Sequence, residues 1–210
     1  KDYVGKRLKI EDLKEMKEKI NTTVQNIIRN YVREENIYKG KNIIIVETVK
    51  EYVKKVIELD KRTVEKGNGL KIIAVESEFE NKIRESGVEY KIKGKIDRID
   101  ELNGEVRVID YKSGKKLRQR NITIKGSEEL TKEKGIYNLQ LLIYMLGIKE
   151  EFKEKTIKSG IINLKNISEG VLEGVFNGKT VLNNTEMENY KNEIIKIIGN
   201  ILDTRKVFKN

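Results

Sequence analysis

The feature that most constrains this chain is the dipeptide Asn103-Gly104, which lies between two runs of alternating apolar and polar residues. Asn-Gly is the strongest short signal for a β-hairpin, because both central residues of a type I′ turn need positive φ. A turn centred there fixes which residues face each other across the two strands. Asp100 then faces Arg107, an opposite-charge pair of the kind that stabilises a hairpin. The sequence therefore predicts a hairpin with a defined register.

The same register places Asp97 directly opposite Asp110. Two carboxylates about 5 Å apart repel each other by about 3 kcal/mol at an effective dielectric of ~20, so we expect a positive group between them. Side chains two residues apart share a face of a strand, which puts Lys112 beside Asp110 and opposite Lys95. One interpretation is a divalent metal site next to an ammonium group. The other is a solvated face on which Lys95 and Lys112 offset the aspartates.

Composition limits the chemistry available to this site. The chain contains no Cys and no His, which excludes zinc-thiolate sites, iron–sulfur clusters, cysteine nucleophiles and histidine-based triads. With only oxygen donors left, Mg²⁺ or Mn²⁺ is the expected ion, and the backbone carbonyl of Tyr111 is a further candidate ligand. Such an ion polarises a phosphoryl oxygen and lowers the pKa of a bound water. The reaction indicated is hydrolysis of a phosphodiester.

Hydrophobic periodicity predicts a mixed α/β domain. Helical spacing is followed by alternation with a period of two, then by another helix, further strands and a closing helix. We expect one domain over residues 1–210, with a helical lead-in (1–68), a catalytic core (69–178) and a closing helix (179–210). Within it we expect helices over residues 10–33, 46–64, 139–146 (ended by Gly147) and 187–201, and strands beginning near residues 73, 90, 105, 159 and 171.

The charge balance favours a polyanionic partner. Lys and Arg number 44 against 34 Asp and Glu, a net charge of +10, although a general compositional bias would give the same sign. Four cations follow Lys112 closely, and they are either DNA-phosphate contacts or a flexible, solvated charged run: Lys115, Lys116, Arg118 and Arg120. No apolar run approaches the roughly 18 residues that span a bilayer. We expect a cytoplasmic protein with DNA, not a membrane, as its partner.

Three segments together resemble the PD-(D/E)XK nuclease superfamily and, within it, the RecB-like branch of helicase–nuclease subunits. They are GKIDRID at residues 94–100, DYKSG at residues 110–114 and QLLIY at residues 140–144. The resemblance implies a restriction-endonuclease-like fold, a mixed central sheet flanked by helices. It also implies Asp97 and Asp110 as metal ligands, Lys112 as the catalytic lysine, and Gln140 and Tyr144 as further site residues. Glu76 corresponds to a glutamate often found upstream and is a candidate extra ligand.

The resemblance implies a metal-dependent deoxyribonuclease, of exonuclease type, within a larger helicase–nuclease used in recombination and repair. Two departures stand out, because many RecB-like nucleases use an upstream His as a ligand and some branches carry cysteines for an iron–sulfur cluster. The alternative is a noncatalytic DNA-binding or scaffolding module that retains the nuclease fold. A plain structural domain is the third interpretation.

Overall fold

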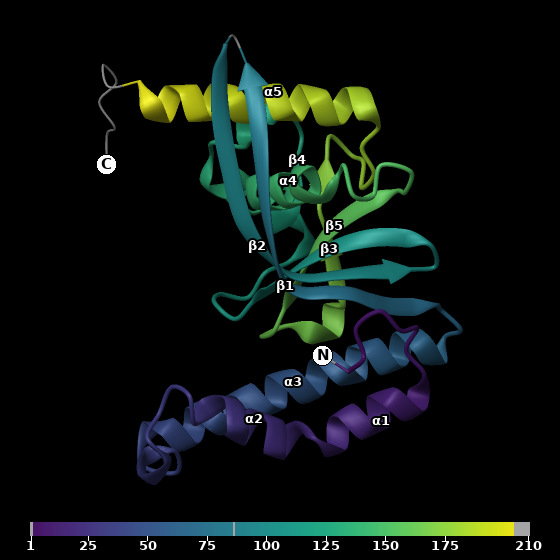
Figure 1. Ribbon diagram of the computed structural model, residues 1–210, viewed down its shortest axis with the longest axis vertical. Coiled ribbons are helices and arrows are strands. Elements are labelled where there is room, and N and C mark those ends of the chain that lie inside the picture. Colours follow the sequence, from purple (N-terminus) through teal and green to yellow (C-terminus); the bar gives the residue numbers. More distant parts are fainter. Residues whose placement is uncertain (1, 86, 204–210) are drawn as a thin grey trace.

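The computed structural model describes residues 2–85 and 87–203, and it is a mixed α/β structure (Figure 1). Short 3₁₀ turns connect the main elements: Glu34–Asn36, Gln119–Ile122, Ser127–Glu129, Glu133–Gly135 and Ile167–Glu169. The helices are α1 (Ile10–Glu18), α2 (Ile20–Ile28), α3 (Lys41–Glu65), α4 (Ile136–Ile148) and α5 (Asn184–Leu202). The strands are β1 (Leu70–Glu85), β2 (Val88–Leu102), β3 (Glu105–Lys112), β4 (Thr123–Ile124), β5 (Ile157–Asn163), β6 (Val171–Glu173) and β7 (Val175–Phe176).

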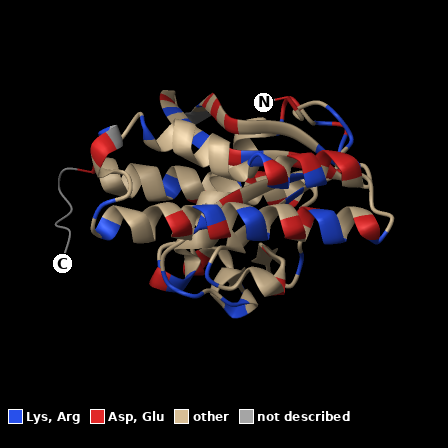
Figure 2. Cartoon of the chain, turned by 90° about the horizontal axis from the view of Figure 1, so that it is seen from below, with Lys and Arg blue, Asp and Glu red and all other residues tan. Residues whose placement is uncertain are grey.

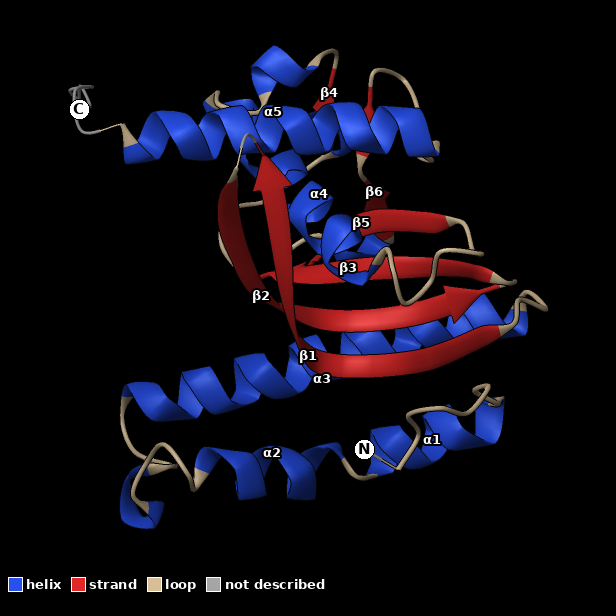
Figure 3. Cartoon of the chain, turned by 45° about the horizontal axis from the view of Figure 1, so that its top comes forward, coloured by secondary structure: helices blue, strands red, loops and turns tan. Residues whose placement is uncertain are grey.

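A five-stranded sheet of order β1-β2-β3-β5-β6 forms the centre. Its pairs are antiparallel except β3 with β5, which run parallel. Helix α4 packs against β2 and β5, with α5 beyond it, while α1, α2 and α3 form a separate layer below the sheet (Figures 1 and 3). The sheet therefore presents one face to α4 and the other to α3. No helix among the described residues is long and apolar enough to cross a bilayer.

The central hairpin has the predicted register. Asp100 pairs with Arg107 and Ile99 with Val108, and the turn residues Asn103 and Gly104 have φ values of 54° and 93°. The ladder ends at Arg98 and Ile109, one step before the aspartates. Asp97 and Asp110 therefore lie where the two strands stop pairing with each other.

Strand β1 bends where it passes the same region. Its register against β2 shifts between Ile72 and Ala74, and Glu76 adopts a positive φ of 52°. Bulges increase the local twist of a strand and are common beside active sites. The long β1–β2 hairpin extends up across α5, which continues on both sides of it in the view of Figure 1.

Several of the predicted helix boundaries are wrong. The helix predicted over residues 46–64 begins earlier, at Lys41. The segment predicted as one helix over residues 10–33 is divided at Lys19 and ends at Ile28, with the poor helix formers Asn21, Thr22 and Thr23 directly after the break. Gly147 does not end α4 but lies inside it. A Cβ at this position would lie 2.6 Å from the Phe79 ring, so the glycine allows the ring to pack against the helix.

The later strands and the closing helix largely match the expectation. The run predicted from residue 171 to 176 is divided at Gly174 into β6 and β7, which belong to different sheets. A Cβ on Gly174 would lie 2.7 Å from the Ser159 hydroxyl, so a close approach to β5 occurs there. The closing helix is α5, and residues 204–210 of the predicted segment lie outside the described residues.

Apolar side chains form two clusters, one on each side of the sheet. The larger one lies between the sheet and α4, with α5 closing it through Met187, Tyr190 and Ile194. The smaller one joins the N-terminal helices to the start of β1, and its buried members include Leu13, Val24, Val46, Ile57 and Leu70. The N-terminal helices are therefore packed onto the sheet by apolar contacts at its lower edge.

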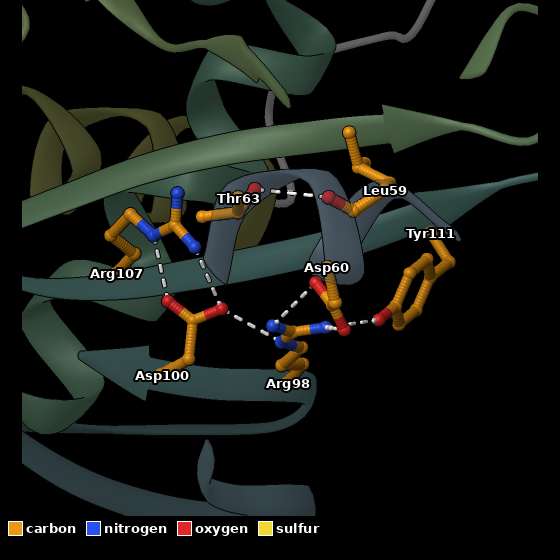
Figure 4. A network of polar contacts seen from close by, with 7 residues as sticks. All are labelled: Leu59, Asp60, Thr63, Arg98, Asp100, Arg107 and Tyr111. Atoms are coloured by element: carbon orange, nitrogen blue, oxygen red, sulfur yellow. Dashed lines mark hydrogen bonds and ion pairs between the residues drawn. The ribbon is translucent and has the colours of Figure 1, made fainter. Parts of the chain in front are cut away.

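Three buried charged residues and the partly buried Arg107 connect α3 to the sheet on this lower face, and we refer to Asp60, Arg98, Asp100 and Arg107 as the ionic network (Figure 4). Arg98 donates to both carboxylate oxygens of Asp60, at 2.8 and 3.1 Å, and to Asp100 at 2.7 Å. Arg107 donates twice to Asp100, at 2.7 and 3.0 Å. Burial alone would lower the pKa of Arg98, but the charges of Asp60 and its neighbours raise the pKa above its usual value. Arg98 therefore remains charged inside the protein.

We predict that Asp60→Asn destabilises the fold by about 3–5 kcal/mol, because it removes the negative charge that compensates a buried guanidinium. Urea unfolding followed by circular dichroism measures the effect. Glu188→Gln, which removes an exposed carboxylate paired with Lys191, is the matched control and should cost less than about 1 kcal/mol. Similar losses for the two variants would show that the ionic network does not anchor α3.

Candidate functional site

Asp110, Lys112, Gln140 and Tyr144 meet on the α4 side of the sheet. Asp110 and Lys112 lie at the end of β3, while Gln140 and Tyr144 are four residues apart on α4, where spacing of this kind brings side chains together. The Gln140 amide nitrogen donates to Asp110 Oδ1 at 2.9 Å and to the Tyr144 hydroxyl at 2.7 Å. Its amide oxygen accepts from Lys112 Nζ at 2.9 Å. One amide therefore holds the acid, the lysine and the phenol in a fixed arrangement.

Asp97 joins this group from β2. Its Oδ2 accepts a hydrogen bond of 2.8 Å from the backbone N–H of Tyr111, the residue between Asp110 and Lys112. Burial raises the pKa of Asp110, and the negative charge of Asp97 adds to this shift. Tyr111 contacts Asp97 through its backbone N–H. The role of its carbonyl as a metal ligand stays a prediction.

Asp110 lies in an environment that disfavours its charged form. It is buried, with 3% of its surface exposed, and burial raises its pKa despite the opposing effect of Lys112. Its Oδ2 lies 2.9 Å from Lys112 Nζ, yet among the described residues no donor reaches this atom with hydrogen-bond geometry. A buried carboxylate oxygen without a hydrogen bond, next to a second carboxylate, is a donor set that suits a hard divalent cation. The residues present therefore fit Mg²⁺ or Mn²⁺.

Tyr144 and Tyr137 border the site with aromatic rings. Burial and the charges of Asp110 and Asp97 act to raise the pKa of Tyr144, so its hydroxyl stays protonated at neutral pH. Tyr137, on the first turn of α4, has its ring centroid 5.9 Å from Lys112 Nζ. Lys112 is thus held by a carboxylate, an amide and the face of a ring.

Glu76 is not brought together with the two aspartates. Its carboxylate forms an ion pair of 2.5 Å with Lys95 and is largely exposed. In the described part of the chain, no three acidic side chains gather closely enough to hold a metal. The β2–β3 ladder ends at Arg98 and Ile109, so Lys95 and Lys112 are not paired across it as the sequence suggested. The role of Glu76 as a ligand stays a prediction that this geometry does not favour.

The four predicted DNA-binding cations, Lys115, Lys116, Arg118 and Arg120, are all exposed. Their segment is anchored rather than loose, because Leu117 is fully buried and the buried amide of Asn163 donates to the carbonyls of Lys112 and Lys115 at 3.3 and 3.0 Å. The face formed by the N-terminal helices carries acidic and basic residues interspersed (Figure 2). The cations following Lys112 are therefore a local concentration of positive charge beside the site.

The sequence did not identify the residues that hold the site residues in position without belonging to the site. Within the segment GKIDRID, the predicted pairing of Asp100 with Arg107 is confirmed, but the buried contacts of Arg98 with Asp60 and Asp100 were not predicted. Asp60 had a detectable signal, since it follows Val46 and Ile57 at helical spacing and so occupies the buried face of α3. Asn163 ends a buried strand and carried no signal of its own.

A family model for the PD-(D/E)XK nuclease superfamily matches residues 3–208. The chain belongs to this superfamily. Its mixed sheet between helices agrees with the restriction-endonuclease-like fold that was predicted. Members of the superfamily are usually metal-dependent nucleases that act on DNA and use divalent ions such as Mg²⁺ or Mn²⁺.

Other comparisons add little. No curated protein matches this chain. A solved structure described as "Crystal structure of SSO0001" matches with 16% identity and a TM-score of 0.32, covering 91% of this chain and 97% of that one. A TM-score this low has no bearing on the assignment.

The raised pKa of Asp110 predicts a pH dependence of stability without metal. The folded state binds the Asp110 proton more tightly than the unfolded state, so this contribution is present below the unfolded pKa and is lost as the pH rises through the folded pKa. The Tm of the wild type minus that of Asp110→Asn should therefore fall as the pH rises from about 4 to 8. Thermal melts in EDTA measure this difference, with Glu151→Gln as an exposed control. A difference that grows with pH would contradict the electrostatics described.

Proposed function

We propose that this chain is a metal-dependent DNA nuclease of the RecB-like type, acting on strand ends in association with a helicase. The observation that carries the proposal is the convergence of two carboxylates, one ammonium and one amide at the end of β3. Their separation along the chain, from Asp97 to Gln140, gives no local structural reason for them to meet. A site for a cation and a phosphate explains their arrangement.

Each residue has a distinct task in hydrolysis. An ion held by Asp97 and Asp110 supplies positive charge to the scissile phosphate and lowers the pKa of a bound water. Lys112 directs its ammonium at the same place and offsets the negative charge that develops as the water attacks. Gln140 fixes Lys112 relative to Asp110, and Tyr144 supports Gln140 through its hydroxyl. The arrangement is preorganised, since one amide contacts all three neighbours.

The finer features of the proposal rest on the motifs. The segments at residues 94–100, 110–114 and 140–144 supply every residue of this cluster and together match the RecB-like pattern. That pattern is typical of nuclease domains that work beside a helicase in recombination and repair. Exonuclease action and a helicase partner are therefore part of the proposal.

We predict that Asp110→Ala abolishes cleavage of linear DNA in Mg²⁺ or Mn²⁺. Lys112→Ala should lower kcat by about 10²–10³-fold, because it removes one preorganised positive group. Product formation from end-labelled oligonucleotides measures both effects, and Lys196→Ala, on exposed α5 surface, is the control. Cleavage by Asp110→Ala at the wild-type rate would eliminate the proposal.

A second candidate is a noncatalytic DNA-binding module that retains the nuclease fold. It is favoured by the finding that, within the described residues, no three acidic side chains gather closely enough to hold a metal ion. Calorimetric titration with Mn²⁺ separates the two candidates. Binding that is lost in Asp97→Asn and Asp110→Asn supports the nuclease, whereas no Mn²⁺ binding together with salt-sensitive DNA binding supports the module.

The cations of the anchored segment should contribute to DNA affinity in a salt-dependent way. Replacing Lys115, Lys116, Arg118 and Arg120 with Ser removes four positive charges, and each phosphate contact contributes about 0.9 to the slope of log K against log salt concentration. We expect the slope to become shallower by about 2–4 and binding to weaken equally for all sequences. Fluorescence anisotropy between about 50 and 200 mM NaCl measures the slope. An unchanged slope would show that these side chains remain in solvent when DNA binds.

A further inference from the structure

We refer to Asp97, Asp110, Lys112, Gln140 and Tyr144 as the catalytic cluster. A basic cavity lies beside this cluster, and we call the cavity the lysine pocket. It has a volume of about 370 Å³ and is lined by Lys115, Asn121, Lys132, Glu133, Lys134 and Tyr137. The volume is within the range of roughly 300–1,000 Å³ that is typical of small-ligand sites. The function proposed above uses none of its residues except Lys115.

Tyr137 links the lysine pocket to the catalytic cluster. Its ring lines the pocket and lies 5.9 Å from Lys112 Nζ. It is on the first turn of α4, three residues before Gln140. One residue, Tyr137, therefore contacts both the pocket and the lysine that contacts Asp110.

The charge in the pocket favours an anion. Lys134 is paired with the buried Glu129, so its charge is largely offset. Lys115 and Glu133 are 3.6 Å apart and highly exposed, with 67% and 89% of their side chains accessible, and such a pair contributes little. Lys132 is exposed, and its charge acts on Glu129 more weakly than that of Lys134 does. The pocket thus has an excess of positive charge available to a ligand.

An aromatic ring next to cations in a concave site is the combination that binds single-stranded nucleic acid, since bases stack on the ring while lysines contact the phosphates. A duplex offers only its phosphate ridges to such a cavity, because its bases are already stacked inside. The ring therefore adds affinity only for an unpaired nucleotide. The sequence alone placed no aromatic residue among the cations that follow Lys112, and it is the fold that brings Tyr137 to them.

We propose that the lysine pocket binds one unpaired nucleotide of the DNA strand adjacent to the scissile phosphate, with its base on Tyr137 and its phosphate near Lys132. The proposal rests on the proposed function for the position of the scissile phosphate. It assigns to the site a preference for single-stranded DNA or for frayed ends over intact duplex. Tyr137 and Lys132 are then specificity-determining residues.

The test measures binding separately from cleavage. Anisotropy of a fluorescent 12-nucleotide single strand and of the matching blunt duplex is recorded in EDTA for the wild type, Tyr137→Ala, Tyr137→Phe, Lys132→Gln and the control Lys196→Gln. Stacking of one base corresponds to a loss of about 5–150-fold, and we expect Tyr137→Ala to show it for the single strand only. Tyr137→Phe should restore most of the affinity, because the ring is retained. Lys132→Gln should weaken single-strand binding and reduce its salt dependence.

Several results would overturn the inference. Equal binding of the single strand by Tyr137→Ala and wild type would remove the stacking role, and an equal loss for strand and duplex would remove the strand preference. Tighter, Tyr137-dependent binding of an RNA strand of the same sequence would replace DNA as the ligand. Thermal melts establish that each variant is folded. Failure of the wild type to cleave any DNA in Mn²⁺ would count against the proposed function alone, since the binding measurements require no hydrolysis.

Discussion

The fold depends on a guanidinium buried where two strands and a helix meet. Arg98, which is 2% exposed, satisfies Asp60 on α3 and Asp100 beside it on β2, and it also contacts the Tyr111 hydroxyl at 3.3 Å (Figure 4). Side chains alternate along a strand, so Arg98 follows Asp97 on β2 and points to the opposite face of the sheet. On β3, Tyr111 lies between Asp110 and Lys112 and likewise points to the face opposite theirs. Each charged residue of the candidate site therefore has a neighbour anchored to the ionic network on the other side.

This arrangement explains how the sheet tolerates a buried Asp110 whose charge Lys112 offsets only in part. A carboxylate whose burial raises its pKa favours any local movement that exposes it to water. The parallel pairing of β3 with β5 holds its backbone from Val106 to Lys112, and the Gln140 amide holds its side chain. Neighbouring interactions thus hold Asp110 in a position that disfavours its charged form, as is common where a site is preorganised for a ligand.

The sequence predicted those parts of the structure that are determined locally. Asn103-Gly104 fixed the register from Leu102 to Arg98 because only a turn with two positive φ values fits the dipeptide there. The prediction at Gly147 was wrong because glycine is common at helix ends and also occurs where an aromatic ring packs closely against a helix. Only the position of Phe79 distinguishes these two cases. The roles of Asp60 and Tyr137 depend on contacts between segments far apart in the chain. Glu76 had the expected place in the strand, but the bend of β1 brings its carboxylate to Lys95.

The division of charge between the two faces also restricts how a polyanion approaches. On the α3 side, Arg98 and Arg107 are neutralised by Asp60 and Asp100, and the outer surface of the helices carries both signs interspersed (Figure 2). On the α4 side, the exposed cations directly follow Lys112, and the backbone that carries them is tied to β5 through Asn163. A net charge of +10 therefore attracts DNA from many directions, whereas a lasting contact is favoured where unpaired cations stand on an anchored segment. Because that segment begins at Lys112, the proposed DNA contact there would bring a phosphate to the two aspartates.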